Sequence, residues 1–388
     1  MIKLRNKSDC AGCFSCVNAC PKKCIVMQAD EEGFSYPRVD ASRCVECGLC
    51  ERVCPMLAPR VGGGAPQMYA AVNNDEAVRA QSSSGGIFTL LARSVIARGG
   101  VVFGAAFGEG LEVLHIEAKT EEELARIRCS KYVQSRIGDM YARAKAYLNG
   151  GTPVLFTGTP CQIHGLLKYL GREYDDLLTQ DIICHGVPSP SVWQRYLSYL
   201  GEQHGAEPIS ACFRQKIPGS KKYNLSFGFE NGEKYEVLSG NDPYMQAFLR
   251  NYSLRPSCYS CRFRGKKRVS DITLADYWGL EKVHPDFHNE GDTSLLWVNT
   301  DKGKRILEEI LPQIKAIPTE FSDAIAENPS AVRSFPSPAN RKRFMKNVMR
   351  KEFTYAVSRY CRPTAYERCK RFGKRAIKKV FSWCYTSK

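Results

Sequence analysis

The sequence predicts a multidomain protein of the α+β or α/β class, built from three parts of different composition. Nine of the 18 cysteines lie within the first 54 of the 388 residues. Predicted strands and helices alternate through the middle of the chain. Beyond residue 340, Lys and Arg far outnumber Asp and Glu, and this end carries nearly all of the net charge of +16. We therefore expect a small cysteine-rich module, a mixed α/β domain and a basic helical tail.

The overall composition excludes several classes of protein. Apolar residues make up 43% of the chain, which is enough to build cores for the two or three domains that its length allows. The most apolar region, residues 85–107, is interrupted by Arg93 and Arg98, so we expect no transmembrane span. The N-terminus lacks the apolar stretch of a secretory signal, which predicts a cytoplasmic protein with reduced cysteines. The cysteines therefore need an explanation other than disulfides.

Eight cysteines form two copies of the pattern C-x2-C-x2-C-x3-C-P, 34 residues apart: Cys10, Cys13, Cys16 and Cys20, then Cys44, Cys47, Cys50 and Cys54. This spacing resembles that of bacterial two-cluster ferredoxins, in which the fourth cysteine of each run binds the other cluster. We expect one [4Fe–4S] cluster on Cys10, Cys13, Cys16 and Cys54 and a second on Cys44, Cys47, Cys50 and Cys20. Zinc is the alternative metal. Cys24 lies outside the pattern and is expected to be a small buried apolar residue.

The Pro- and Gly-rich residues 58–66 are expected to link the ferredoxin-like module, residues 1–57, to a main domain of residues 67–335. The predicted elements of that domain are strands at 68–72, 100–107 and 154–157, helices at 85–97, 121–128, 140–148 and 161–170, and a hairpin within 211–237. Neither a Rossmann glycine pattern nor a P-loop occurs in the sequence, so any nucleotide cofactor must be held in another way.

Four further cysteines could complete a third cluster. Cys258 and Cys261 form a C-x2-C pair, while Cys161 and Cys184 lie at the ends of predicted strands, where α/β proteins place their sites. Taken singly, Cys161 and Cys184 would more often be buried structural thiols. The cysteines expected to be structural are Cys129, Cys212, Cys361, Cys369 and Cys384.

Two short polar segments could face an anionic cofactor. Residues 81–86 place serines and glycines before a predicted helix, where backbone N–H groups can bind a flavin pyrophosphate. Residues 130–135 add the cation of Lys131 and the ring of Tyr132. Each segment alone would more often be an ordinary helix cap or a surface strand. Residues 271–279 end a predicted strand, with Asp276 and Trp278 beside a glycine, and Trp278 alone would be a packed aromatic at a turn.

The cysteine motifs and polar segments described above, taken together and in their order along the chain, resemble the beta subunit of coenzyme F420 hydrogenase and dehydrogenase. The resemblance covers residues 66–335. The resemblance implies a domain that holds FAD and a [4Fe–4S] cluster, and that moves electrons between a two-electron carrier and one-electron clusters. It implies that the third cluster is held by Cys161, Cys184, Cys258 and Cys261. It also implies that FAD is faced by Ser84, Gly85, Gly86, Lys131 and Tyr132. F420 or another hydride carrier would be the two-electron partner.

The expected activity is that of an iron–sulfur flavoprotein oxidoreductase, an enzyme without an identified catalytic acid or base. A non-catalytic electron-relay subunit of a larger redox complex is the alternative, and it predicts clusters without independent turnover. A reductase of polysaccharide or envelope biosynthesis is a third interpretation. His164 and His185 follow two of the candidate ligands and could tune them through hydrogen bonds, although a structural role is the more frequent one.

The C-terminal segment, residues 336–388, is expected to include a basic amphipathic helix at 373–384. Such a helix could bind an acidic redox partner, such as a ferredoxin or a partner oxidoreductase subunit, or the inner face of the membrane. It could also pack on its own domain. Nucleic acid is not expected, because no recognised binding fold accompanies the charge. Deletion of residues 363–388 should weaken partner association at low salt.

Overall fold

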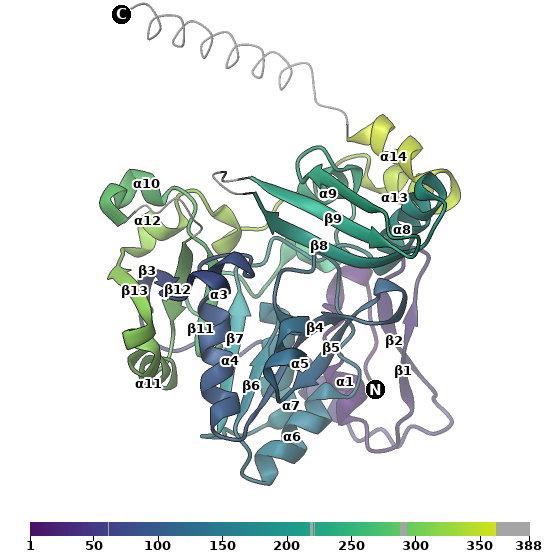
Figure 1. Cartoon of the computed structure of the whole chain (residues 1–388). Coiled ribbons are helices and arrows are strands. Elements are labelled where there is room, and N and C mark those ends of the chain that lie inside the picture. The colour runs from purple at the N-terminus through teal and green to yellow at the C-terminus, as the bar shows by residue number, and fades with distance from the viewer. Residues whose placement is uncertain (61, 218–219, 221, 288–292, 362–388) are drawn as a thin grey trace, which may run out of the picture.

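A computed structural model describes residues 1–60, 62–217, 220, 222–287 and 293–361 (Figure 1). The predicted helix at 373–384, Cys369 and Cys384 lie outside the described residues.

A mixed sheet of eight strands forms the centre of the main domain, in the order β13-β3-β12-β11-β7-β6-β4-β5. The strands are β3 (Gln67–Asn73), β4 (Val101–Phe107), β5 (Val113–Ala118), β6 (Val154–Thr157), β7 (Leu177–Ile182), β11 (Ile272–Asp276), β12 (Ser294–Val298) and β13 (Ile314–Pro318). The four neighbours β11, β7, β6 and β4 are parallel. Their carboxyl ends therefore meet at one edge of the sheet, which is the usual place for a site in an α/β domain.

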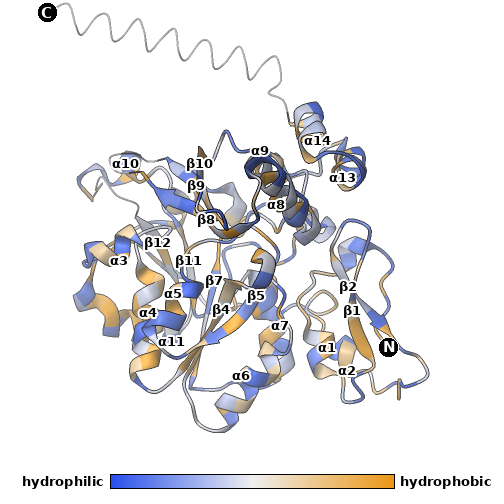
Figure 2. Ribbon diagram, turned by 45° about the vertical axis from the view of Figure 1, so that its right-hand side comes forward, coloured by the Kyte–Doolittle hydropathy of each residue, from blue (hydrophilic) through white to orange (hydrophobic). Residues whose placement is uncertain are grey.

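Helices cover both faces of this sheet. One core contains apolar side chains of α4 (Ile87–Ala97), α5 (Glu121–Ile127) and α11 (Asp301–Ile310). α4 carries both apolar and polar residues, as the colours along it in Figure 2 show, so it can bury one side and expose another. The other core contains residues of α6 (Met140–Asn149) and α7 (Pro160–Leu170), packed on Phe103 and Phe156.

A second sheet of three antiparallel strands, β8 (Pro208–Lys216), β9 (Tyr223–Phe229) and β10 (Lys234–Leu238), lies above the central sheet in Figure 1. The predicted hairpin is confirmed: Gly232 turns the chain between β9 and β10 with a φ of 85°. This sheet shares a core with α8 (Pro190–His204), α9 (Pro243–Leu249), α13 (Arg341–Arg350) and α14 (Phe353–Tyr360). Phe344 and Met345 are buried in that core, so the folded body extends to residue 361 and includes the first part of the expected tail.

The N-terminal module is ferredoxin-like and contains α1 (Ser15–Ala19), the hairpin of β1 (Ile25–Ala29) and β2 (Ser35–Val39), and α2 (Leu49–Arg52). The duplication visible in the sequence recurs in the backbone. α1 follows Phe14 with a φ of 65°, and α2 follows Gly48 with a φ of 69°. The module (purple in Figure 1) lies beside the main domain, with α1 against α7.

The remaining elements are short: the α-helices α3 (Glu76–Ala80), α10 (Leu280–Val283) and α12 (Phe321–Ile325), and the 3-10 helices η1 (Lys7–Asp9), η2 (Glu109–Leu111), η3 (Pro256–Ser260), η4 (Pro285–Phe287), η5 (Leu311–Gln313) and η6 (Pro329–Ala331). Strand β7 ends at Ile182, so Cys184 lies two residues beyond the strand that it was expected to end. In the described part of the chain, no helix combines the length and apolar character needed to cross a membrane.

Candidate functional site

The first set of cysteines is Cys10, Cys13, Cys16 and Cys54. Cys10 and Cys13 precede α1, Cys16 lies in its first turn, and Cys54 follows α2. Burial, and then the negative charges of Cys10 and Cys54, raise the pKa of Cys13 to about 12. Burial and the thiolates of the same set raise the pKa of Cys16 as well. Cys16 and Cys54 belong to one buried cluster with Ala11, so members of this set from both halves of the module lie close together.

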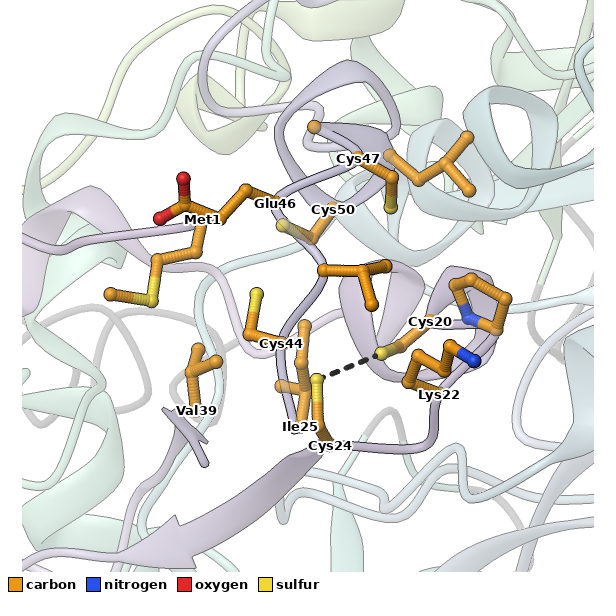
Figure 3. A pocket seen from close by; sticks show the side chains of 14 residues that line it. Met1, Cys20, Lys22, Cys24, Ile25, Val39, Cys44, Glu46, Cys47 and Cys50 are labelled. Carbon is orange, nitrogen blue, oxygen red and sulfur yellow. Dashed lines mark hydrogen bonds between the residues drawn. The ribbon is translucent and has the colours of Figure 1, made fainter. Parts of the chain in front are cut away.

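The second set, Cys20, Cys44, Cys47 and Cys50, lines a single pocket together with Cys24 (Figure 3). Cys24 is buried as expected, but it is not merely an apolar residue, because its Sγ lies 3.4 Å from that of Cys20. The pocket opens to the surface, since Cys47 is exposed and Val45 is 57% exposed.

The third set also converges. Cys161 in the first turn of α7, Cys184 beyond β7, Cys258 in η3 and Cys261 line one pocket. Burial and the neighbouring thiolates raise the pKa of Cys184 to about 12 and that of Cys161 well above its usual value. Thr159 Oγ1 lies 3.1 Å from Cys161 Sγ, and the backbone N–H of Val187 donates to Cys258 Sγ at 3.5 Å. In the residues that the structure describes, no group of three or more His, Cys, Asp or Glu is arranged to hold a single metal ion.

Two arginines that sequence reasoning missed line the third pocket. Arg264 donates to the carbonyl oxygen of His185 at 2.9 Å, and Arg268 lies 3.7 Å from the carboxylate of Asp181. The Nε atoms of both are buried and lack a hydrogen-bond partner among the described residues. Unpaired buried donors are costly and call for an anion or another acceptor. A metal cluster held by four thiolates is such an anion, so the residues of this pocket fit one. In the sequence, the only indication of these two arginines was the run of basic residues that follows Cys261.

The third pocket touches the N-terminal module directly. Its lining includes Ala11, which lies between two cysteines of the first set, and Met56. Arg255, three residues before Cys258, is 1% exposed and donates to the carbonyl oxygen of Cys10 at 2.7 Å. It also donates to Gln134 at 3.0 Å and to the carbonyl oxygen of Ser35 at 3.0 Å. One buried side chain thus holds the first and third cysteine sets together.

The serine and glycine segment lies at the start of α4, as predicted. Ser84 Oγ donates to the carbonyl oxygen of Thr293 at 3.3 Å and lies 3.2 Å from Ser294 Oγ, while the Gly85 N–H donates to Ser294 Oγ at 2.9 Å. Gly86 precedes the helix with a φ of 81°. The hydroxyl of Thr293 is buried without a partner among the described residues, so this corner holds one polar group that a ligand could satisfy.

Asp276 ends β11 opposite Ser294 and forms a salt bridge of 2.6 Å with Arg214. Its second oxygen, Oδ1, is buried and unpaired within the described part of the chain. Trp278, in the turn that follows, is 52% exposed, so it is not the packed aromatic that this position alone would suggest.

Lys131 and Tyr132 are positioned differently from each other. The ammonium of Lys131 donates to the carbonyl oxygens of Arg126, Ile127 and Arg128 at 2.8, 3.0 and 2.6 Å. It therefore caps the last turn of α5, where a cation is stabilised by the helix dipole, and burial lowers its pKa to about 8. These contacts occupy its donors, in contrast to the expected contact with a phosphate.

The ring of Tyr132 lies 5.1 Å from that of Phe248, whose ring lies 5.0 Å from that of His185, the neighbour of Cys184. The Ser130 N–H donates to Ser83 Oγ at 2.8 Å, which brings the two predicted polar segments side by side. Two rings thus connect these segments with the third cysteine set.

The two histidines have partners away from the thiols. His164 Nδ1 lies 2.8 Å from the carbonyl oxygen of Pro160, and His185 Nε2 lies 2.7 Å from Asn251 Oδ1. These contacts are those of structural histidines, the more frequent of the two roles considered from the sequence.

Comparison with known families agrees with this geometry. Residues 151–322 match the family model that describes the C terminus of the coenzyme F420 hydrogenase/dehydrogenase beta subunit, and residues 9–58 match that of the 4Fe-4S dicluster domain. The predicted resemblance is confirmed. Residues 9–58 are thus similar to a 4Fe-4S dicluster domain, and residues 151–322 are similar to the C-terminal region of this beta subunit.

Two relatives with curated descriptions match short stretches of the chain. NADH-quinone oxidoreductase subunit I 2 of Geobacter metallireducens is 36% identical over 63 residues, 15% of this chain and 48% of the relative. Ferredoxin 7Fe of Hydrogenibacillus schlegelii is 43% identical over 44 residues, 11% of this chain and 50% of the relative. The chain thus spans about half the length of these two relatives.

One solved structure that the chain matches is a chain of the F420-reducing [NiFe] hydrogenase complex from Methanosarcina barkeri. It is 16% identical, and the superposition covers 76% of this chain and 91% of that chain with a TM-score of 0.45.

Proposed function

We propose that the chain is a flavin- and iron–sulfur-dependent oxidoreductase that passes electrons between a hydride carrier and one-electron carriers through three [4Fe–4S] clusters. The observation that carries the proposal is the pocket lined by Cys161, Cys184, Cys258 and Cys261, which also contacts the ferredoxin-like module through Ala11. If only the dicluster module bound clusters, the main domain would have no use for a pocket lined by four cysteines.

The three cysteine sets follow one another in space. The third set adjoins the first through Ala11 and Arg255. The first adjoins the second, because Cys16 and Cys54 belong to the same buried cluster as Cys50, with Cys20 and Cys44 packed against it. The second opens to solvent at Cys47. We infer that electrons move along this line and are exchanged with an external protein, such as a ferredoxin or a partner oxidoreductase subunit, at the surface around Cys47.

FAD would be held at the corner between α4, β11 and β12. Ser84, Gly85, Gly86 and Tyr132 are the residues proposed to face it, and the unpaired oxygens of Thr293 and Asp276 are groups that it could satisfy. A bound flavin supplies the conversion between a hydride and single electrons. The protein's part is to orient it near Phe248 and His185, the rings that lead to Cys184.

F420 is the first hydride carrier to examine, because the matched family is described by that coenzyme. Nicotinamides and ferredoxins complete the set of carriers for a screen. The proposed function requires reduction or oxidation of one of them by the isolated holoprotein.

The experiment is the substitution Cys161→Ala, analysed in protein purified without oxygen. We expect a loss of between one and about four irons per chain, because the cubane loses one of its four ligands. The two N-terminal clusters should remain reducible by dithionite, whereas carrier oxidation should no longer reduce them. Cys361→Ala, at a buried cysteine outside the three sets, is the matched control. Unchanged iron content in Cys161→Ala would contradict the third site.

A further inference from the structure

Lys216, the last residue of β8, holds the loop that precedes α4. Its Nζ donates to the carbonyl oxygen of Arg79 at 2.6 Å and to that of Ser84 at 3.1 Å. Between these two residues, the carbonyl oxygen of Gln81 accepts a hydrogen bond of 3.2 Å from Cys129 Sγ. The loop is thus anchored by a cation from the second sheet, which no motif in the sequence had indicated.

The end of β8 is shaped so that its basic side chains reach the central sheet. The register of β8 against β9 shifts between Cys212 and Gln215, as in a β-bulge. Bulges are frequent next to active sites, where they redirect a side chain. Arg214, within this irregularity, forms its salt bridge of 2.6 Å with Asp276 at the end of β11. The end of β8 therefore contacts two sides of the proposed flavin corner, the loop before α4 and the end of β11.

This corner favours an anion. The first N–H groups of α4 and the helix dipole attract negative charge, and Gly86 immediately precedes the helix. Because Lys216 binds the carbonyl oxygen of Ser84, its ammonium group lies close to the same helix start. Ser84 Oγ in turn donates to the carbonyl oxygen of Thr293, whose buried hydroxyl has no partner among the described residues. A lysine beside a helix N-terminus is a recurring way to bind phosphate groups.

Two other cations near this corner are less suited to an incoming anion. Arg214 is paired with the carboxylate of Asp276. Lys131 donates to three carbonyl oxygens at the end of α5. Lys216 donates to neutral carbonyl oxygens of the loop that leads into α4, so it is the cation best placed for this role.

We propose that Lys216 selects FAD at this corner, because it neutralises the diphosphate of the dinucleotide and holds the loop that receives it. The inference rests on the proposed function, since it assigns a further residue to the flavin site described there. No additional hydrogen bond from the ammonium group is required, because a positive charge close to a phosphate is favourable in a partly buried site. Riboflavin, which has the same ring system without a phosphate, would gain little from Lys216.

The test uses full-length, cluster-loaded protein from which flavin has been removed at high salt. Equilibrium dialysis against FAD and against riboflavin measures the two dissociation constants. We expect Lys216→Met, which keeps the apolar part of the side chain, to weaken FAD binding by roughly 10- to 100-fold. Riboflavin binding should change little. Lys216→Arg, which keeps the charge, should recover part of the lost FAD affinity.

Lys234→Met is the matched control, because Lys234 is an exposed residue of β10 in the same sheet, and it should bind FAD as the wild type does. FAD and riboflavin affinities that fall by the same factor in Lys216→Met would reveal a merely structural residue. That result, or an unchanged FAD affinity, would overturn this inference alone. A wild-type protein that binds neither flavin would overturn it together with the flavin site of the proposed function.

Discussion

Individual arginine side chains form the hydrogen bonds that surround the cysteine pockets. Arg255 is buried where the two modules meet, and its guanidinium reaches main-chain oxygens of Cys10 and Ser35 in the N-terminal module. The duplicated cysteine pattern could be predicted from the sequence because its spacing is local. Arg255, Arg264 and Arg268 could not, because a basic string indicates a solvated surface until the fold shows what encloses it.

Arg264 should raise the reduction potential of a cluster in the third pocket, because a nearby positive charge stabilises the extra electron. We expect Arg264→Gln to lower that potential by roughly 50 mV, about 1 kcal/mol for one electron. Redox titration followed by electron paramagnetic resonance measures the shift. Lys267→Gln, at an exposed neighbouring position, is the control, and equal shifts in both variants would exclude a specific role of Arg264.

His115 should contribute to the pH dependence of the free energy of unfolding. Burial lowers the pKa of this ring to about 4, and its Nε2 lies 3.0 Å from the carbonyl oxygen of Thr157. In the unfolded chain, His115 takes up a proton near pH 6.5, whereas in the folded protein it does so only near pH 4. The stability that the neutral buried ring provides is therefore fully present above pH 6.5 and is lost as the pH falls toward 4.

Between pH 7.5 and 5.5, the wild-type protein should therefore lose about 1.4 kcal/mol more free energy of unfolding than His115→Phe, which keeps a ring against Phe156. Urea unfolding at the two pH values measures this difference. Parallel losses in the two proteins would show that His115 does not titrate as described.

Helix α7 connects the main domain with the N-terminal module. Cys161 occupies its first turn, and one turn later Gly165 lies so close to the module that a Cβ would meet Ser15 Oγ at 2.5 Å. The sequence predicted this helix and most neighbouring elements, since these follow from periodicity and turns. It did not predict the partners of Lys131, because the carbonyls at the end of α5 leave no pattern in side-chain types.

Gly165→Ala should push α7 away from the module. Because the neighbouring atoms are buried and close, we expect a loss of about 1–3 kcal/mol in stability. The melting temperature, followed by the visible absorption of the clusters, measures the change. Gly240→Ala, where a Cβ would meet no atom within 4 Å, should change it little. Equal melting temperatures for Gly165→Ala and the wild type would mean that the helix and module are not in contact.

Side-chain contacts fix the N-terminal module to the main domain, in addition to the covalent link through residues 58–66. Glu32 of the β1–β2 turn forms a salt bridge of 2.7 Å with Arg341 of α13, and Ser189 donates to the carbonyl oxygen of Glu32. A third contact is made by Asn18, which donates to the carbonyl oxygen of Gly138 at 2.9 Å. These contacts join residues far apart in sequence, which is why composition suggested only a linker at this boundary.

Arg341→Met should weaken this docking. Loss of one partner leaves Glu32 partly buried without its counter-charge, and we expect a cost of roughly 2–4 kcal/mol. Limited proteolysis between residues 58 and 66 should become faster, whereas Arg305→Met, at an exposed position of α11, should leave the rate unchanged. An unchanged rate in Arg341→Met would show that the salt bridge does not hold the module.

On the proposed function, one chain should hold three cubanes and a flavin. The most direct measurement is the content of iron, acid-labile sulfide and flavin per chain in protein purified without oxygen. We predict about twelve irons, about twelve sulfides and one flavin, from three [4Fe–4S] clusters and one cofactor site. About eight irons without flavin would contradict it and leave a two-cluster ferredoxin module joined to a domain with another role.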